Sequence, residues 1–123
     1  MRKVFLKLDG IKGESQNAGH KDEIEIASFY WGRNQMSTFT AGSGLKDLTI
    51  IKRADKSTPY LRVASTSGQD FQGQLTLEDF TARGSLVRSI AFELQSVFVD
   101  SVTGIQAGEV IALSCKSIKL VRS

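Results

Sequence analysis

The sequence predicts a mainly β fold, a two-sheet β-barrel with one short α-helix packed outside it. Three observations support this prediction: apolar and polar residues alternate along several segments, one proline and eleven glycines punctuate the 123-residue chain, and only one segment has helical spacing. Glycine marks turns and bulges, whereas proline cannot donate a hydrogen bond within a sheet. Because no repeat or low-complexity linker interrupts the pattern, residues 1–123 are expected to form one domain.

Six segments have the alternation or the β-rich composition of strands. The first covers residues 3–8, where Val4, Leu6 and Leu8 alternate with their neighbours until Gly10. The second begins at Ile24, and its alternation slips around residues 27–28, which indicates a bulge or a strand covered on both faces. The other four strands are expected at 48–53, around 75–77, at 86–102 and at 110–121.

Two of these strands carry more detailed expectations. In the long strand 86–102, Ile90, Phe92 and Leu94 are predicted to share one face, and Val97 with Val99 the other. The second strand ends in an aromatic run that Gly32 stops. We expect the indole of Trp31 there to fill the end of the barrel.

The only convincing helix begins near residue 58. Thr58 is placed to act as the N-cap, and Pro59 falls at the first helical position, where its missing N–H costs nothing. Gly68 can end the helix in a left-handed conformation. One face has the three-to-four spacing of residues that pack together, namely Tyr60, Val63, Ala64 and Ser67.

Charge and apolar content narrow the class of protein. The net charge is +3 and the basic residues are scattered, whereas a nucleic-acid-binding protein concentrates them on one stripe or helix. Apolar runs are far too short to span a membrane, so no direct membrane insertion is expected. Lys7 and Asp9 cut short the opening apolar run, so no signal peptide is expected. A single cysteine, Cys115, excludes an internal disulfide and fits a reducing compartment.

No catalytic, cofactor-binding or metal-binding residue is predicted. His20 is the only histidine and no other His or Cys has ligand spacing, so we interpret it as a solvated or capping loop residue. Cys115 follows an apolar run in the last strand and is interpreted as a small buried residue. No serine lies in a Gly-x-Ser-x-Gly motif, and Ala41–Gly44 lacks the lysine of a phosphate-binding loop. We therefore expect a role in assembly or binding without a cofactor, not an enzyme.

Several short motifs occur in series along residues 3–121. They are Phe5-Leu6-Lys7-Leu8, Ile11-Lys12-Gly13-Glu14-Ser15, His20 with Glu23-Ile24-Glu25-Ile26, Trp31-Gly32, Asp55-Lys56-Ser57-Thr58-Pro59-Tyr60-Leu61 and Ser67-Gly68. In this order and at this spacing they resemble the haemolysin-coregulated protein family, the tube subunit of the bacterial type VI secretion system.

The resemblance implies a β-barrel of two sheets with a helix against it, related in fold to phage tail-tube proteins. It also implies homohexameric rings that stack into a tube, with sheath, tip and effector proteins as partners. Family members are made in the cytoplasm and leave through their own apparatus without a signal peptide. The resemblance thus implies a structural protein that delivers effectors, with no nucleic-acid partner.

Residues 33–44 lack periodicity, and so long a loop in a small domain is more often functional. Residues 38–40 have β propensity and could extend a neighbour's sheet, while residues 41–44 are small enough to form a hinge. We predict that this segment is an inter-ring arm whose subunit interface consists of Met36, Thr38, Phe39 and Thr40. The alternative is that Met36 and Phe39 fold back over the protein's own core.

Two other functions remain open at this point. The first is a small β-barrel nucleic-acid-binding protein, because the pI is about 9.2 and bases stack on exposed aromatics such as those of residues 29–31. In a tube subunit the same aromatics would be buried. The second is a hydrolase that uses Cys115 or His20, for which the sequence contains no accompanying motif.

Overall fold

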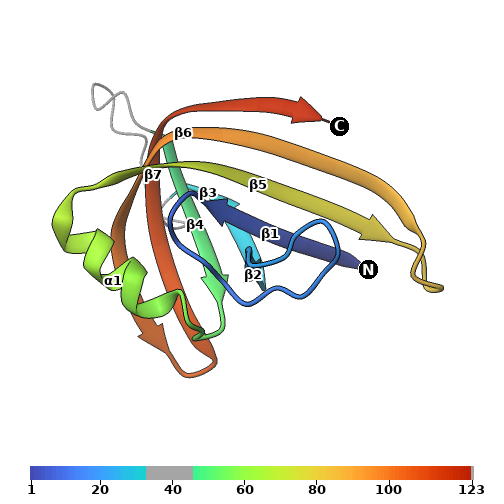
Figure 1. The fold of residues 1–123 in the computed structure, drawn as a ribbon, viewed down its shortest axis with the longest axis horizontal. Helices are drawn as coiled ribbons and strands as arrows, with labels where there is room; N and C mark the ends of the chain where they lie inside the picture. The colour runs from blue at the N-terminus through green and yellow to red at the C-terminus, as the bar shows by residue number, and fades with distance from the viewer. Residues whose placement is uncertain (33–45, 123) are drawn as a thin grey trace.

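The computed structural model describes residues 1–32 and 46–122, and it confirms a mainly β fold with one helix (Figure 1). Within these residues seven strands form one continuous antiparallel sheet with the order β2-β1-β5-β6-β7-β4-β3. The elements are β1 (Arg2–Leu8), β2 (Ile24–Ile26), β3 (Ser28–Trp31), β4 (Lys46–Lys52), α1 (Thr58–Ser67), β5 (Asp70–Phe80), β6 (Leu86–Ile105) and β7 (Gly108–Arg122).

The sheet curls into a half-barrel because its two edge strands follow each other in the chain. β2 pairs with β1 and β3 pairs with β4, so the chain crosses between the two edges within one residue, Ala27. The Ala27 N–H donates to the Ile51 carbonyl oxygen of β4 at 2.8 Å. The slip in alternation at residues 27–28 was interpreted as a bulge or as a strand covered on both faces, and this is wrong, because the structure has a break between two strands there.

The core fills the inside of the curled sheet. Val4, Leu6 and Leu8 all face it, as their alternation in β1 predicted, and α1 contributes Leu61 and Ala64 to the same buried cluster. Burying apolar surface of this extent is the main term that favours the folded state. Phe5 points to the opposite face of β1 and is also buried, which shows that another part of the chain covers that face.

A bulge changes which side of β6 faces the core. The prediction that Val97 and Val99 lie on the face opposite Leu94 is wrong, since all three belong to the same buried cluster. The cause is Ser96, whose φ of 52° is left-handed, at the point where the β5–β6 register shifts. An inserted residue of this kind reverses the alternation beyond it.

The extent of α1 agrees with the prediction from the sequence, but its N-cap residue and its buried face do not. Thr58 is not the N-cap: Ser57 holds that position, and its side chain makes no capping hydrogen bond. Gly68 has φ 73° and ends the helix as predicted. The predicted buried face is wrong in part, because Tyr60 and Val63 are 62% and 65% exposed. The buried strip of the helix consists instead of Leu61 and Ala64, which lie three residues apart on its neighbouring face.

Buried polar clusters and the candidate assembly surface

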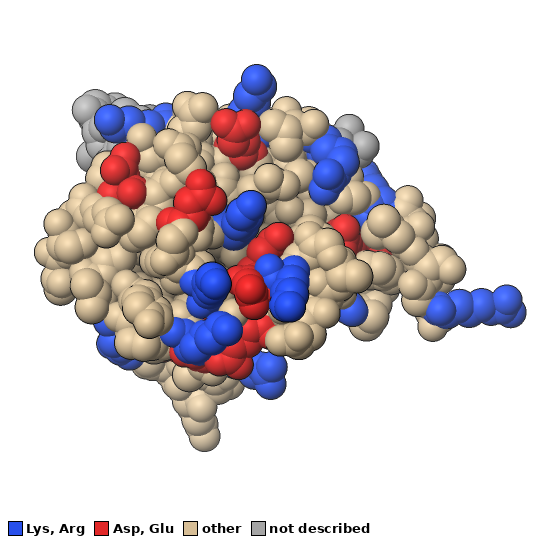
Figure 2. Space-filling view, in the orientation of Figure 1, with Lys and Arg blue, Asp and Glu red and all other residues tan. Residues whose placement is uncertain are grey.

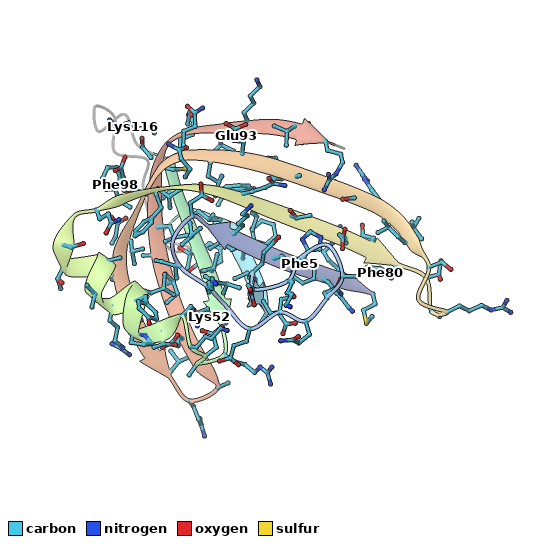
Figure 3. All side chains as sticks on the ribbon, in the orientation of Figure 1. Phe5, Lys52, Phe80, Glu93, Phe98 and Lys116 are labelled. Carbon is cyan, nitrogen blue, oxygen red and sulfur yellow. The ribbon has the colours of Figure 1, made fainter. Side chains whose placement is uncertain are left out.

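A buried lysine joins three parts of the chain near the start of α1 (Figure 3). Lys52, 1% exposed, places its Nζ 2.8 Å from Glu109 Oε1 and 2.9 Å from Asp55 Oδ1. The same Nζ donates to the Arg53 carbonyl oxygen at 2.9 Å. An ammonium has three N–H donors, so this environment can satisfy all of them. Such pairing is what allows a charged group to remain buried.

The Lys52 cluster explains the Asp-Lys-Ser-Thr-Pro motif. Asp55 Oδ1 accepts hydrogen bonds from both the N–H and the hydroxyl of Ser57, which shapes the turn into α1. Glu109 lies at the start of β7, so the cluster links that strand to the end of β4. Gly108 is required beside it, because a Cβ there would lie 2.2 Å from the Lys52 carbonyl oxygen.

Thr58 is part of the Lys52 cluster, and its replacement tests how much its hydroxyl contributes to stability. Its Oγ1 donates to Glu109 Oε1 at 2.8 Å and accepts from the Asp55 N–H at 3.1 Å. We expect Thr58→Ala to lower the free energy of unfolding by about 1.5–3 kcal/mol, the range for a hydrogen bond to a charged group. Thr58→Ser keeps the hydroxyl and should lose less. Urea unfolding measures both, and equal losses would contradict this role.

A second cluster holds the loop between β1 and β2 against the outer face of the sheet. The imidazole of His20 stacks on Phe5, with ring centroids 4.3 Å apart and planes 6° apart. Its Nδ1 lies 3.1 Å from Glu23 Oε1, and its Nε2 lies 3.2 Å from Glu78 Oε2. The interpretation of His20 as a solvated or capping residue is wrong, because the side chain is largely buried.

This arrangement covers Phe5 and explains the Lys-Gly-Glu-Ser motif. The loop folds back on itself through hydrogen bonds from Gly13 N–H to Asp22 O and from Ser15 N–H to Glu23 O. A Cβ at Gly13 would lie 2.5 Å from the Glu23 carbonyl oxygen, so only glycine allows this approach.

Cys115 is buried, as the sequence predicted, and its Sγ lies 3.7 Å from the Lys46 carbonyl oxygen. Burial raises the pKa of the Cys115 thiol to about 11, so the thiol stays protonated near neutral pH. His20 contacts Glu23 and Glu78, so it is not placed as a base for this thiol. In the described part of the chain no group of three or more His, Cys, Asp or Glu side chains is arranged to hold a metal ion.

The aromatic run of β3 lies largely at the surface, so the expectation that a tube subunit buries these side chains is wrong for Tyr30 and Trp31. Trp31 was predicted to fill the end of the barrel, and this is wrong, because its side chain is 45% exposed. Its ring meets Phe29 and Phe92 edge-on, with centroids 5.8 and 5.5 Å away. Trp31 is the last residue of β3, which is an edge strand of the sheet, so only part of the indole packs on neighbours.

The C-terminal half of β7 offers a surface for assembly. β4 pairs with β7 only as far as Cys115, so among residues 1–32 and 46–122 no strand borders the outer edge of residues 116–122. We call this segment the β7 edge. It carries Leu120 and Val121, which are about half exposed. An unpaired strand edge with apolar side chains is a template for pairing with another chain.

The predicted interface residues Met36, Thr38, Phe39 and Thr40 lie outside the described residues. No helix among those described is both long and apolar enough to cross a membrane.

The fold is a curled antiparallel sheet with one helix, and two buried polar clusters hold its loops and the start of α1 in place. Residues 5–121 match the family model described as type VI secretion system effector, Hcp. The chain therefore belongs to the Hcp family.

Individual relatives agree with this assignment. Protein hcp1 of Pseudomonas aeruginosa is 34% identical over 115 residues, which cover 86% of this chain and 70% of that protein. The crystal structure of Hcp1 from Salmonella typhimurium superposes with a TM-score of 0.72 at 32% identity, covering 95% of this chain and 83% of the other. Hcp2 from the same organism gives 0.72 at 28% identity, covering 98% and 87%. The chain is a tube subunit of the type VI secretion system, and the comparisons give no support to a nucleic-acid-binding function.

Proposed function

We propose that this chain assembles into homohexameric rings, which stack into the inner tube and carry effectors into target cells. The observation that carries the proposal is the β7 edge, which no strand among residues 1–32 and 46–122 borders and which exposes Leu120 and Val121 on a member of the Hcp family. A contact between this edge and a different surface of the next copy is heterologous. Such contacts form a ring when the rotation between copies closes.

In this proposal the partners are other copies of the chain, together with the sheath, tip and effector proteins of the apparatus. The protein leaves the cytoplasm through the apparatus itself. Its contribution is structural: it provides the wall of the tube.

The molar mass of the protein in solution tests whether it forms hexameric rings. Light scattering coupled to size exclusion at micromolar concentration should give a mass near six times that of the 13.5 kDa protomer. Negative-stain images of the same fraction should show rings. A monodisperse monomer at all concentrations and salt conditions would argue against the proposal.

Stacking is assigned in the same proposal to the arm formed by residues 33–44. Replacing Met36 and Phe39 with serine should abolish tubes while rings and protomer stability stay nearly unchanged, because each apolar side chain contributes about 1.5–3 kcal/mol when fully buried between rings. Negative-stain imaging and urea unfolding read the two effects separately. A variant that loses several kcal/mol as a monomer would place these residues in the protein's own core.

A further inference from the structure

The outer face of α1 is apolar at its centre. Tyr60 and Val63 lie three residues apart, so they are neighbours on one strip of the helix, and both are more than half exposed. Arg62 is the only charged residue of the helix, and its side chain is 54% exposed. Neither cluster described above explains why these apolar side chains face solvent.

A pocket of about 320 Å³ adjoins this strip, lined by Gly10, Lys12, Lys56 and Tyr60. It lies where the loop after β1 meets the segment before α1, and the Lys56 N–H holds the two together by donating to Glu14 Oε2 at 2.7 Å. Figure 2 shows Lys and Arg side chains gathered on this face of the molecule, around a few carboxylates.

The nearby carboxylates are already occupied. Asp55 and Glu109 bind the Lys52 ammonium, and Glu109 also lies 3.8 Å from the Arg62 guanidinium. Within the described residues, no carboxylate lies at ion-pair distance from the ammonium groups of Lys12 or Lys56. The surface therefore combines two lysines that have no ion-pair partner among the described residues with an exposed apolar strip.

We propose that this surface, which consists of Lys12, Lys56, Tyr60, Arg62 and Val63 and is called the α1 patch, docks an acidic amphipathic segment of a partner protein. Carboxylates of the segment would face the two lysines and the arginine. Its apolar side chains would cover Tyr60 and Val63. Matched charges of this kind fix register and speed association, and the apolar anchors supply affinity.

The same observations disfavour two other occupants. A second copy of the patch would bring like charges together, which costs binding free energy. A nucleic acid would meet a surface with one exposed aromatic and no stripe of basic residues. In Figure 1, α1 lies well apart from the C-terminal end of β7, so docking at the α1 patch and a contact through the β7 edge do not compete.

Fluorescence anisotropy tests the proposal with three labelled probes: a helical peptide with Glu on one face and Leu on the other, the same peptide with Lys in place of Glu, and a single-stranded oligonucleotide. The acidic peptide should bind, and higher salt should lower its affinity because exposed charges are screened. The other two probes should bind at least about tenfold more weakly, since neither matches both the charge and the apolar strip. Failure of the acidic peptide to bind at millimolar concentration, or equal binding of either other probe, would overturn the proposal.

Variants locate the binding. The double variant Lys12→Glu with Lys56→Glu should lower the affinity for the acidic peptide by about tenfold or more. Tyr60→Ser should lower it by about fivefold, as expected for an anchor residue. Arg83→Glu with Arg88→Glu changes the net charge equally in the β5–β6 hairpin region and should leave affinity within about twofold. An equal loss in this control would mean that net charge alone drives binding, and would also overturn the proposal. Ring mass, measured on each variant, separates failure of docking from failure of assembly.

Discussion

Replacing Lys52 with methionine is expected to lower the free energy of unfolding by about 3–5 kcal/mol, the range measured when one partner of a buried ion pair is removed. Methionine keeps much of the length of the lysine side chain, so the loss of stability reflects the missing ammonium charge more than a change in packing. Without the ammonium, the carboxylates of Asp55 and Glu109 remain close together, and Glu109 is almost completely buried. Urea unfolding at neutral pH measures the effect.

Two further variants make this expectation specific. Lys12→Met removes the same charge from an exposed position and should change stability by less than about 0.5 kcal/mol. Adding Glu109→Gln to Lys52→Met removes one of the uncompensated carboxylates, so the double variant should lose less than the sum of the two single losses. A Lys52→Met protein within 1 kcal/mol of the original, as a rough limit from typical surface substitutions, would contradict the role assigned to the cluster.

The alternation of residues was enough to predict the strands and the extent of the helix. It also marked an irregularity at residues 27–28, although not the break between two strands that lies there, and the sequence predicted the helix stop at Gly68. Each of these features depends on residues close together in the chain. The same local pattern contained a signal for Lys52 that was not used. Lys52 continues the inward-facing series of Leu48 and Ile50 in β4, so a lysine at that position requires a buried counter-charge.

The partners of such residues could not be predicted, because the curl of the sheet brings them together. Glu109 lies 57 positions from Lys52 in the sequence, and Glu78 lies 58 positions from His20. The bulge at Ser96 was also missed, since a serine in a strand carries no mark of a left-handed φ. For α1, two overlapping strips had helical spacing, and only packing against the sheet distinguishes them.

Replacing Leu120 and Val121 with lysine should convert rings into monomers while the protomer keeps its stability. The two side chains are about half exposed in the protomer, so the change costs little there, whereas charges on an edge strand prevent pairing with another chain. A fully buried aliphatic side chain contributes about 1.5–3 kcal/mol, and each contact between subunits would lose part of this binding free energy. A loss of about 1.4 kcal/mol in one contact lowers its association constant tenfold. Because a closed ring needs all of its contacts, the same loss occurs at each of them and the losses add.

The matched control is Tyr60→Lys with Val63→Lys, which adds two lysines in place of two exposed apolar side chains on α1, away from the β7 edge. Light scattering should show rings for this control and monomers for the β7 variant at the same concentration, with equal urea midpoints for both proteins. Rings that survive both changes would mean that another surface closes the ring. Loss of rings in both would mean that added positive charge opposes assembly in general. Only loss confined to the β7 variant assigns ring closure to the β7 edge, because a strand edge can pair in one place whereas charge repulsion acts over the whole surface.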